Sequence, residues 1–130
     1  MRVIIAGSRE FNNYELLKKE GLRIFKELKS EGFNTSRLVT EIVSGGARGA
    51  DTLGEKFAST YGLGIKRFIP DWDGLGKRAG FVRNAEMAVY AKEDLELGVL
   101  IACWDGISKG TKSMIDLANK YGLRVFIIKY

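Results

Sequence analysis

Glycine, hydroxyl and basic side chains gather in three short segments of the 130-residue chain, and these residue types bind phosphate groups. The segments are Gly7–Arg9, Ser44–Asp51 and Trp104–Thr111. Glycine allows backbone N–H groups to approach an anion closely, arginine can donate two hydrogen bonds to one phosphate, and a helix N-terminus attracts negative charge. The three segments therefore predict a binding site for an anionic ligand, and a nucleotide fits them better than a single small anion.

Three residues of these segments have specific expected roles. Arg48 is expected to donate two hydrogen bonds to a phosphate, Asp51 to hold its own loop or a ribose hydroxyl, and Thr111 to cap a helix. Alternatively, each segment is only a tight turn, and none matches a Walker P-loop or the G-x-G-x-x-G fingerprint. Because all three segments combine glycine with hydroxyl and basic side chains, we favour ligand binding over tight turns alone. The predicted contact residues in the segments are Gly7, Ser8, Arg9, Gly45, Gly46, Arg48, Asp51, Asp105, Lys109, Gly110 and Thr111.

The rest of the chain alternates between short apolar runs and segments of helical period, a pattern that is typical of βαβ units. Such runs, buried on both faces, form a parallel sheet covered by helices. We therefore predict an α/β fold with a doubly wound, five-stranded parallel sheet in the order 3-2-1-4-5. Ligands of such sheets lie beyond the carboxyl ends of the strands, where the strand order reverses. The expected strands are Arg2–Ala6, Leu38–Val43, Ile65–Ile69, Gly98–Cys103 and Leu123–Ile128, and the expected helices are one from Asn13, Asp51–Tyr61, Phe81–Lys92 and Thr111–Tyr121.

Composition excludes several kinds of site. The absence of histidine excludes imidazole metal ligands and histidine-dependent catalytic triads. The single cysteine, Cys103, cannot form a disulfide within the chain and is expected to fill space in a buried strand. Asp71, Asp73 and Asp105 carry oxygen atoms of the kind that bind Mg²⁺, but their spacing specifies no metal site.

The formal charge of +5 favours anionic partners, nucleic acid included, although much of it lies on the helix expected after Asn13. Residues 1–130 are expected to form one domain, because the length suits one core and no linker interrupts it. The apolar runs are too short to span a membrane, and the N-terminus resembles a strand rather than a signal peptide. These features predict a cytoplasmic protein with no membrane partner.

The glycine-rich segment 71–80 and the residues after it allow two interpretations. The segment is either a lid over the ligand site or a connection whose Trp72 packs against the edge of the core. Arg83 and Asn84 either face the ligand site or lie on an exposed helix surface, and spacing alone favours the exposed position.

The order of the motifs resembles the YspA-like, YpsA-related branch of the SLOG superfamily, over nearly the whole chain. That superfamily includes the DNA-processing protein DprA and the LOG phosphoribohydrolases, whose relatives were long described as lysine decarboxylases. The resemblance implies a Rossmann-like fold, a nucleotide-derived ligand, a bacterial or phage origin, and Arg83 and Asn84 as site residues. It also implies that copies can associate into a homo-oligomer, although no residue of the sequence specifies such an interface. The motifs are Val3–Arg9, Ser44–Asp51, Pro70–Trp72, Gly76–Asn84 with Met87, and Lys109–Thr111.

The chain departs from the LOG enzymes, which carry the motifs R-K-x-x-M and P-G-G-x-G-T-x-x-E. Residues 83–87 match the first motif except at Asn84, but Met114 stands where the second motif has its glutamate. Methionine cannot act as an acid, a base or a charge stabiliser, so LOG-type hydrolysis is not expected. Glu86 or Asp105 remains as a carboxylate for another mechanism.

Three functions therefore follow from the sequence, in decreasing order of support. The first is binding of a nucleotide or nucleotide-derived ligand, as in a sensor. The second is hydrolysis of an N-glycosidic or phosphoester bond of a nucleotide. The third is DNA binding of the DprA type, for which the charge of +5 is the only support.

Overall fold

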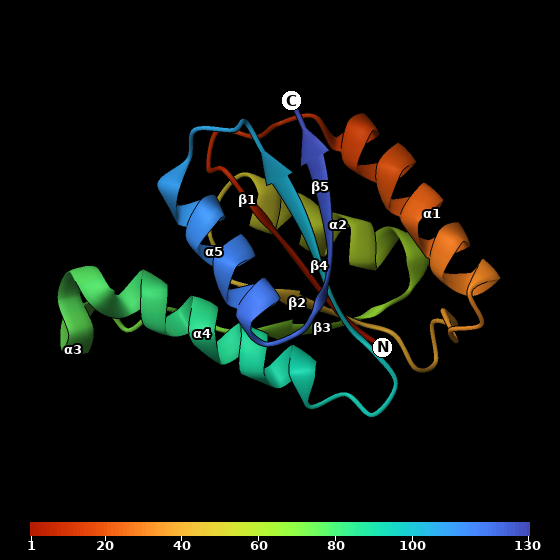
Figure 1. Cartoon of the computed structure of the whole chain (residues 1–130). Coiled ribbons are helices and arrows are strands. Elements are labelled where there is room, and N and C mark those ends of the chain that lie inside the picture. The colour runs from red at the N-terminus through yellow and green to blue at the C-terminus, as the bar shows by residue number, and fades with distance from the viewer.

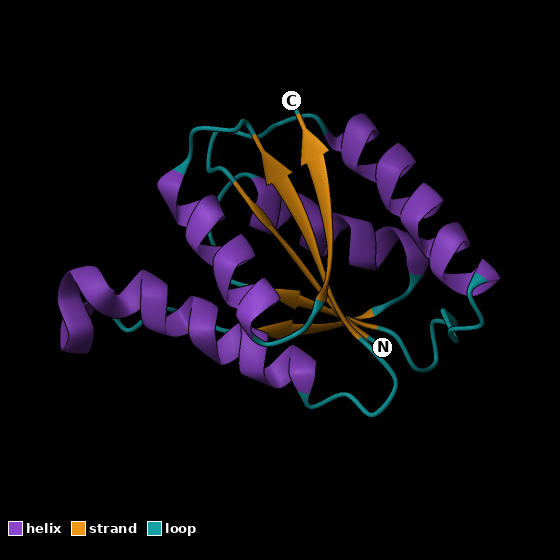
Figure 2. Cartoon of the chain, viewed as in Figure 1, coloured by secondary structure: helices purple, strands orange, loops and turns teal.

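A computed structural model describes residues 1–130 and contains one all-parallel sheet with the strand order β3-β2-β1-β4-β5. The predicted α/β fold and strand order are therefore confirmed (Figures 1 and 2). No helix has the length and apolar character needed to cross a membrane. The strands are β1 (Arg2–Gly7), β2 (Glu41–Ser44), β3 (Gly64–Arg67), β4 (Gly98–Trp104) and β5 (Arg124–Lys129), and the helices are α1 (Tyr14–Ser30), α2 (Ala50–Tyr61), α3 (Trp72–Leu75), the 3₁₀ turn η1 (Gly76–Arg78), α4 (Ala79–Lys92) and α5 (Lys109–Lys120).

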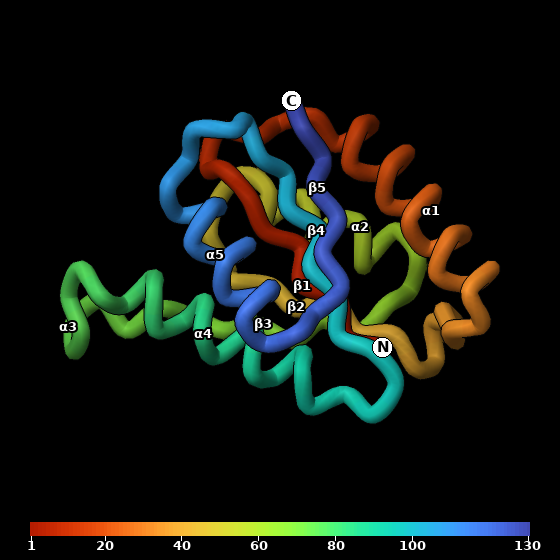
Figure 3. The backbone as a smooth tube through the Cα atoms, viewed as in Figure 1, coloured from red at the N-terminus to blue at the C-terminus, as the bar shows by residue number.

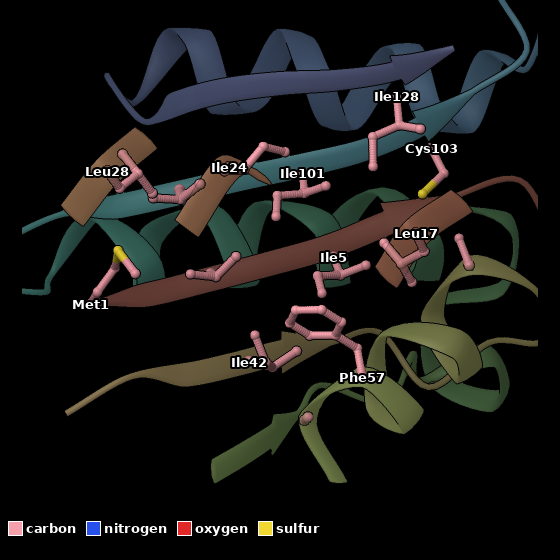
Figure 4. Packing of buried hydrophobic residues seen from close by; sticks show 14 of the residues in the cluster. Met1, Ile5, Leu17, Ile24, Leu28, Ile42, Phe57, Ile101, Cys103 and Ile128 are labelled. Carbon is pink, nitrogen blue, oxygen red and sulfur yellow. The ribbon is translucent and has the colours of Figure 1, made fainter. Parts of the chain in front are cut away.

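Alternate residues of the central strands point to opposite faces of the sheet, and each face is covered by two helices. In β1, Val3 and Ile5 belong to the core beneath α1 and α2, whereas Ile4 belongs to the core beneath α4 and α5. Figure 4 shows the first of these cores, where Phe57 of α2 lies beside Ile5 and Ile42 of the sheet. The tube in Figure 3 shows the two helix pairs on either side of the strands. Burial on both faces explains the uninterrupted apolar character of β1.

Helix α1 contains a glycine, Gly21, at a position where glycine ordinarily weakens a helix. A Cβ atom at this position would lie 3.0 Å from Cε2 of Phe57, so the glycine allows α1 to pack closely against α2. The helix begins where the sequence predicts, because Oδ1 of Asn13 accepts the N–H of Leu16 at 3.0 Å.

Two strands are shorter than their apolar runs. The strand expected at Leu38–Val43 begins only at Glu41, which pairs with Arg2 at the start of β1. Residues before Glu41 would extend past the end of this neighbour, and Leu38 is instead 86% exposed in a turn. The strand expected to reach Ile69 likewise ends at the last residue that finds a partner on β2. An apolar run therefore overestimates a strand wherever the adjacent strand offers no residue to pair with.

The segment expected to be an irregular loop, residues 71–80, contains helical turns that lead directly into α4. Oδ1 of Asp71 accepts the N–H of Gly74 at 2.9 Å and caps the single turn of α3. Gly76, the first residue of η1, has a positive φ of 59° and ends α3. The helix after it begins at Ala79 rather than at Phe81. Local hydrogen bonds form this structure, which explains why hydrophobic period does not predict it.

The helix that follows β4 is capped by Ser108 and not by Thr111, so the predicted cap is wrong by three residues. Oγ of Ser108 accepts the N–H and the Oγ1–H of Thr111, at 3.5 Å and 3.1 Å. Thr111 lies within the first turn of α5 and is buried. Threonine is a common N-cap residue in general. Here, however, Lys109 and Gly110 already have helical backbone, so the helix begins before Thr111.

We expect the substitution Ser108→Ala to lower the free energy of unfolding by about 1 kcal/mol, because the first turn of α5 loses its side-chain acceptor. Urea denaturation followed by circular dichroism measures this change. Ser113→Ala, the same substitution one turn further into α5, is the matched control and should not destabilise the protein. Equal losses in the two variants would contradict the role of Ser108 as the cap.

Candidate functional site

A cavity of about 590 Å³ lies at the carboxyl end of β1, between α4 and α5. The strand order reverses between β1 and β4, so the cavity occupies the place where ligands of doubly wound sheets bind. Its volume is within the range of small-molecule sites. The predicted site residues that line this main cavity are Gly7, Ser8, Arg9, Asp51, Arg83, Asn84, Lys109, Gly110 and Thr111.

The remaining predicted contacts of the β2–α2 loop, Gly45, Gly46 and Arg48, line a neighbouring cavity of about 530 Å³. Arg9 and Arg83 line both cavities. The separation arises because the loop follows β2, on the far side of β1 from the reversal of strand order. The structure thus divides the predicted residues between a main cavity and a side cavity that share two arginines.

Asp105 lines neither cavity. Its Oδ1 accepts the backbone N–H groups of Ile107 and Ser108, each at 2.8 Å. These hydrogen bonds, first that of Ser108 and then that of Ile107, lower the pKa of Asp105. Asp105 therefore shapes the loop before α5, and the structure does not place it among the residues that face a ligand.

Arg48 lies at the exposed rim of the side cavity. Its Nη2 is 3.0 Å from Oε1 of Glu10, and the two side chains are 73% and 81% exposed. An ion pair this exposed contributes little free energy, and it partly neutralises the guanidinium that the sequence assigns to a phosphate. Arg48 is consequently a weaker candidate for a ligand contact than its residue type suggests.

Arg83 is half-buried, although spacing alone favours an exposed position. Its Nη1 donates to the carbonyl of Gly45, and its Nε donates to Oδ1 of Asn84 at 2.9 Å. Burial, which disfavours the charged form, lowers the pKa of Arg83, and the nearby Asp51 opposes this effect. Two hydrogen bonds fix the guanidinium in the wall shared by both cavities, with further N–H groups free to meet an anion.

Asp51 is 5% exposed and lies at the base of the site, in the first turn of α2. Its Oδ2 accepts the N–H of Ala47 at 3.1 Å, so it holds its own loop, one of the two roles expected of it. Burial raises the pKa of Asp51 to about 6, against the opposing effects of this hydrogen bond and of Arg83. A Cβ atom at Gly45 would lie 2.8 Å from Oδ2 of Asp51, so a larger residue there would have to displace this carboxylate.

Ser8 connects the loop after β1 to the start of α2. Its carbonyl accepts the N–H groups of Phe11 and Ala50, both at 3.2 Å. Gly49 has a positive φ of 80°, and a Cβ atom there would lie 2.4 Å from the carbonyl oxygen of Ser8. This contact excludes any larger residue at position 49. The loops of the first and second segments are therefore locked together beside the cavities.

The N-terminus of α5 forms the opposite wall of the main cavity through Lys109, Gly110 and Thr111. Its first N–H groups point out of the helix end, where they and the helix dipole favour an anion. A Cβ atom at Gly110 would meet no atom within 4 Å, so this wall is open to a ligand. An anion in the cavity would be near Lys109 on this side and near Arg9 and Arg83 on the other.

The carboxylates that line the main cavity are Glu10 and Asp51, and neither of the two that the sequence suggests for catalysis is among them. Glu86 is exposed on α4. Met114 is buried and lines the cavity, so an apolar side chain occupies the position of the LOG glutamate. No group of three or more cysteine, aspartate and glutamate side chains is arranged to hold a metal ion.

Cys103 is fully buried in β4, as its place in an apolar run predicts, and burial raises the pKa of its thiol to about 12. Two aromatic residues that the sequence does not assign to the site, Trp72 and Phe81, also line the main cavity. Both are exposed, at 48% and 58%, so Trp72 does not pack into the edge of the core. The sequence signals for them are their places in the motifs Pro70–Trp72 and Gly76–Asn84, and their position in or beside a polar segment that has no apolar period.

Comparison with known proteins agrees with the motif order. The model of the YspA, cpYpsA-related SLOG family matches residues 1–74, which include the first two segments but end before α4 and α5. The "Gene 61 protein" of Mycobacterium phage D29 is 33% identical over 131 residues, covering 95% of this chain and 93% of that protein. No solved structure matches the chain significantly. The chain belongs to the YspA, cpYpsA-related SLOG family.

Proposed function

We propose that the protein binds a nucleotide or nucleotide-derived ligand in the main cavity and acts as a sensor of that ligand. The observation that carries this proposal is the convergence of the α5 N-terminus with Arg9 and Arg83 on one cavity at the reversal of strand order. Membership of a SLOG family is consistent with a nucleotide-related role. The volume of the cavity, about 590 Å³, is also suitable for such a ligand.

In this proposal the phosphate lies against the α5 N-terminus, where Lys109 and the N–H groups around Gly110 meet it. Arg83 and Asn84 bind a second polar group of the ligand, such as a ribose hydroxyl or a further phosphate. Asp51 orders the loop behind them. The roles are divided between elements that are fixed by internal hydrogen bonds, so binding requires little reorganisation of the protein.

A second candidate function is hydrolysis of the bound nucleotide, and one observation favours it. Asp51 lines the cavity, is almost completely buried and has a pKa raised to about 6 by that burial. A carboxyl group with such a pKa can exchange a proton near neutral pH, which general acid or base catalysis needs. This carboxylate replaces Glu86 and Asp105 as the group through which an enzymatic mechanism would act.

A thermal-shift screen tests the proposal with AMP, ADP-ribose, NAD, GTP, cyclic nucleotides and short single-stranded DNA. A ligand at one hundred times its Kd adds about 2.7 kcal/mol of stability, which raises the melting temperature of a domain of this size by several degrees. Chromatography of each stabilising ligand then separates the functions. An intact ligand supports a sensor, whereas a cleaved ligand supports an enzyme.

Salt provides the control for nucleic-acid binding. Stabilisation by DNA through its phosphate backbone should fall steeply as salt rises, whereas a small ligand in a cavity should be much less sensitive. If only DNA stabilises the protein and salt abolishes the effect, the proposed sensor function is wrong and DNA binding takes its place.

A further inference from the structure

Trp72 is a large aromatic residue that the fold leaves on the rim of the main cavity. It lines both the main and the side cavity, and it is 48% exposed. The other tryptophan, Trp104, differs in both respects, because it packs against the core and its Nε1–H donates to the carbonyl of Ser108 at 3.1 Å. Burial of apolar surface therefore explains the presence of Trp104 but not that of Trp72.

The position of Trp72 is nevertheless fixed. It is the first residue of α3, whose single turn is capped by Asp71 through the N–H of Gly74 and closed by the N–H of Leu75, which donates to the carbonyl of Asp71 at 2.9 Å. A Cβ atom at Gly80 would lie 3.5 Å from Cη2 of Trp72, so the edge of the indole lies close to the start of α4. Figure 1 shows α3 and the start of α4 extending away from the sheet. Trp72 belongs to this projecting segment and lines the cavity. Local hydrogen bonds, rather than core packing, fix the backbone that carries the ring.

Cationic and aromatic groups meet at this rim. Arg9 and Arg83 line the same two cavities as Trp72. In nucleotide sites, positive groups hold the phosphate and ribose while an aromatic side chain stacks on the base, and each stacked base stabilises binding substantially. The α5 N-terminus forms another wall of the main cavity and is available to a phosphate. A ligand with its phosphate at α5 can extend across the cavity toward Trp72.

We propose that Trp72 is the base-stacking residue of this site, so that the ligand is one with an aromatic nucleobase and not a sugar phosphate alone. This inference rests on the proposed nucleotide-binding function and adds to it the part of the ligand that is recognised. Phe81 lies on the same cavity but also borders the lysine-lined groove of Lys109 and Lys112, at the phosphate end. The indole, which lies beside the two arginines, is the ring assigned to the base.

The test compares ligands with and without a base. Isothermal titration calorimetry measures the affinities of the wild type, Trp72→Leu and Trp72→Phe for AMP, CMP, GMP and UMP and for ribose 5-phosphate. Trp72→Leu should weaken the affinity for the nucleotides about tenfold, within the range for one stacked base, and leave the affinity for ribose 5-phosphate unchanged. Trp72→Phe should restore most of the loss. Tyr130→Leu, at an exposed aromatic residue that lines neither cavity, is the matched control and should change the nucleotide affinities little.

Each other outcome overturns the inference in a distinct way. If Trp72→Leu binds the nucleotides as well as the wild type does, stacking is wrong and the proposed function stands. If the variant loses nucleotide and ribose 5-phosphate affinity equally, Trp72 shapes the cavity and does not recognise a base. If the wild type binds neither these ligands nor any nucleotide of the thermal-shift screen, the proposed function itself fails, and the inference fails with it.

Discussion

Replacing Arg83 with glutamine is expected to weaken binding of the stabilising nucleotide by about 100-fold, the largest loss of any single substitution in the site. Arg83 is half-buried, and its guanidinium is oriented before binding by the carbonyl of Gly45 and by Oδ1 of Asn84. Contacts of an ordered, partly desolvated charge are stronger than those of a solvated one, and truncation of such a partner costs about 3 kcal/mol. Calorimetric titration measures the affinity.

Arg48→Gln is the matched control, because it removes the same charge from the same face of the protein. Arg48 is 73% exposed and is paired with Glu10, so its loss should change the affinity only a few-fold. Melting temperatures of both variants establish that each is folded. Similar losses in the two variants would show that binding depends on the overall positive field, which would favour nucleic acid over a ligand in the cavity.

The fold is predictable from the sequence to the level of strand order. An uninterrupted apolar run such as Val3–Ala6 occurs where a strand is buried on both faces, and the alternation with helices leaves few right-handed topologies. The ends of the strands are less predictable, because they depend on the neighbour. The run from Leu38 looks like a strand in isolation, yet β1 offers no partner to residues before Glu41.

The candidate site is predictable only in part, for a related reason. Residue type and position after a strand identify the loops, but not the direction of each side chain. Arg48 and Asp105 are residue types that can bind such a ligand. However, Arg48 forms an ion pair with Glu10, and Asp105 accepts hydrogen bonds from the N–H groups of its own loop. Conversely, Trp72 lines both cavities because Asp71 caps a helical turn within a segment that resembles an irregular loop. Such local hydrogen bonds leave no periodic pattern in the sequence.

Asp51→Asn is expected to stabilise the protein at neutral pH, because a charged carboxylate is costly where this side chain lies. Burial raises the pKa of Asp51 from its ordinary value of 3.8 to about 6 in the folded protein. The folded state therefore holds a proton between about pH 4 and 6 that the unfolded state releases, and the free energy of unfolding falls as pH rises through this window. The difference between the two pKa values corresponds to about 3 kcal/mol of free energy of unfolding. This contribution is fully lost once the pH is above the pKa of Asp51 in the folded protein.

Asparagine retains an oxygen that can accept the N–H of Ala47 but does not ionise. The free energy of unfolding of Asp51→Asn should therefore match that of the wild type near pH 4 and exceed it by up to about 3 kcal/mol at pH 7.5. Urea denaturation across this pH range measures the difference. Asp116→Asn, at an exposed carboxylate paired with Lys112, is the control and should change the free energy of unfolding little at pH 7.5. A pH-independent difference for Asp51→Asn would mean that the carboxylate of Asp51 ionises in the folded protein without a penalty.

A stabilised variant that binds nucleotide poorly would instead identify Asp51 as a group kept for function at the expense of stability.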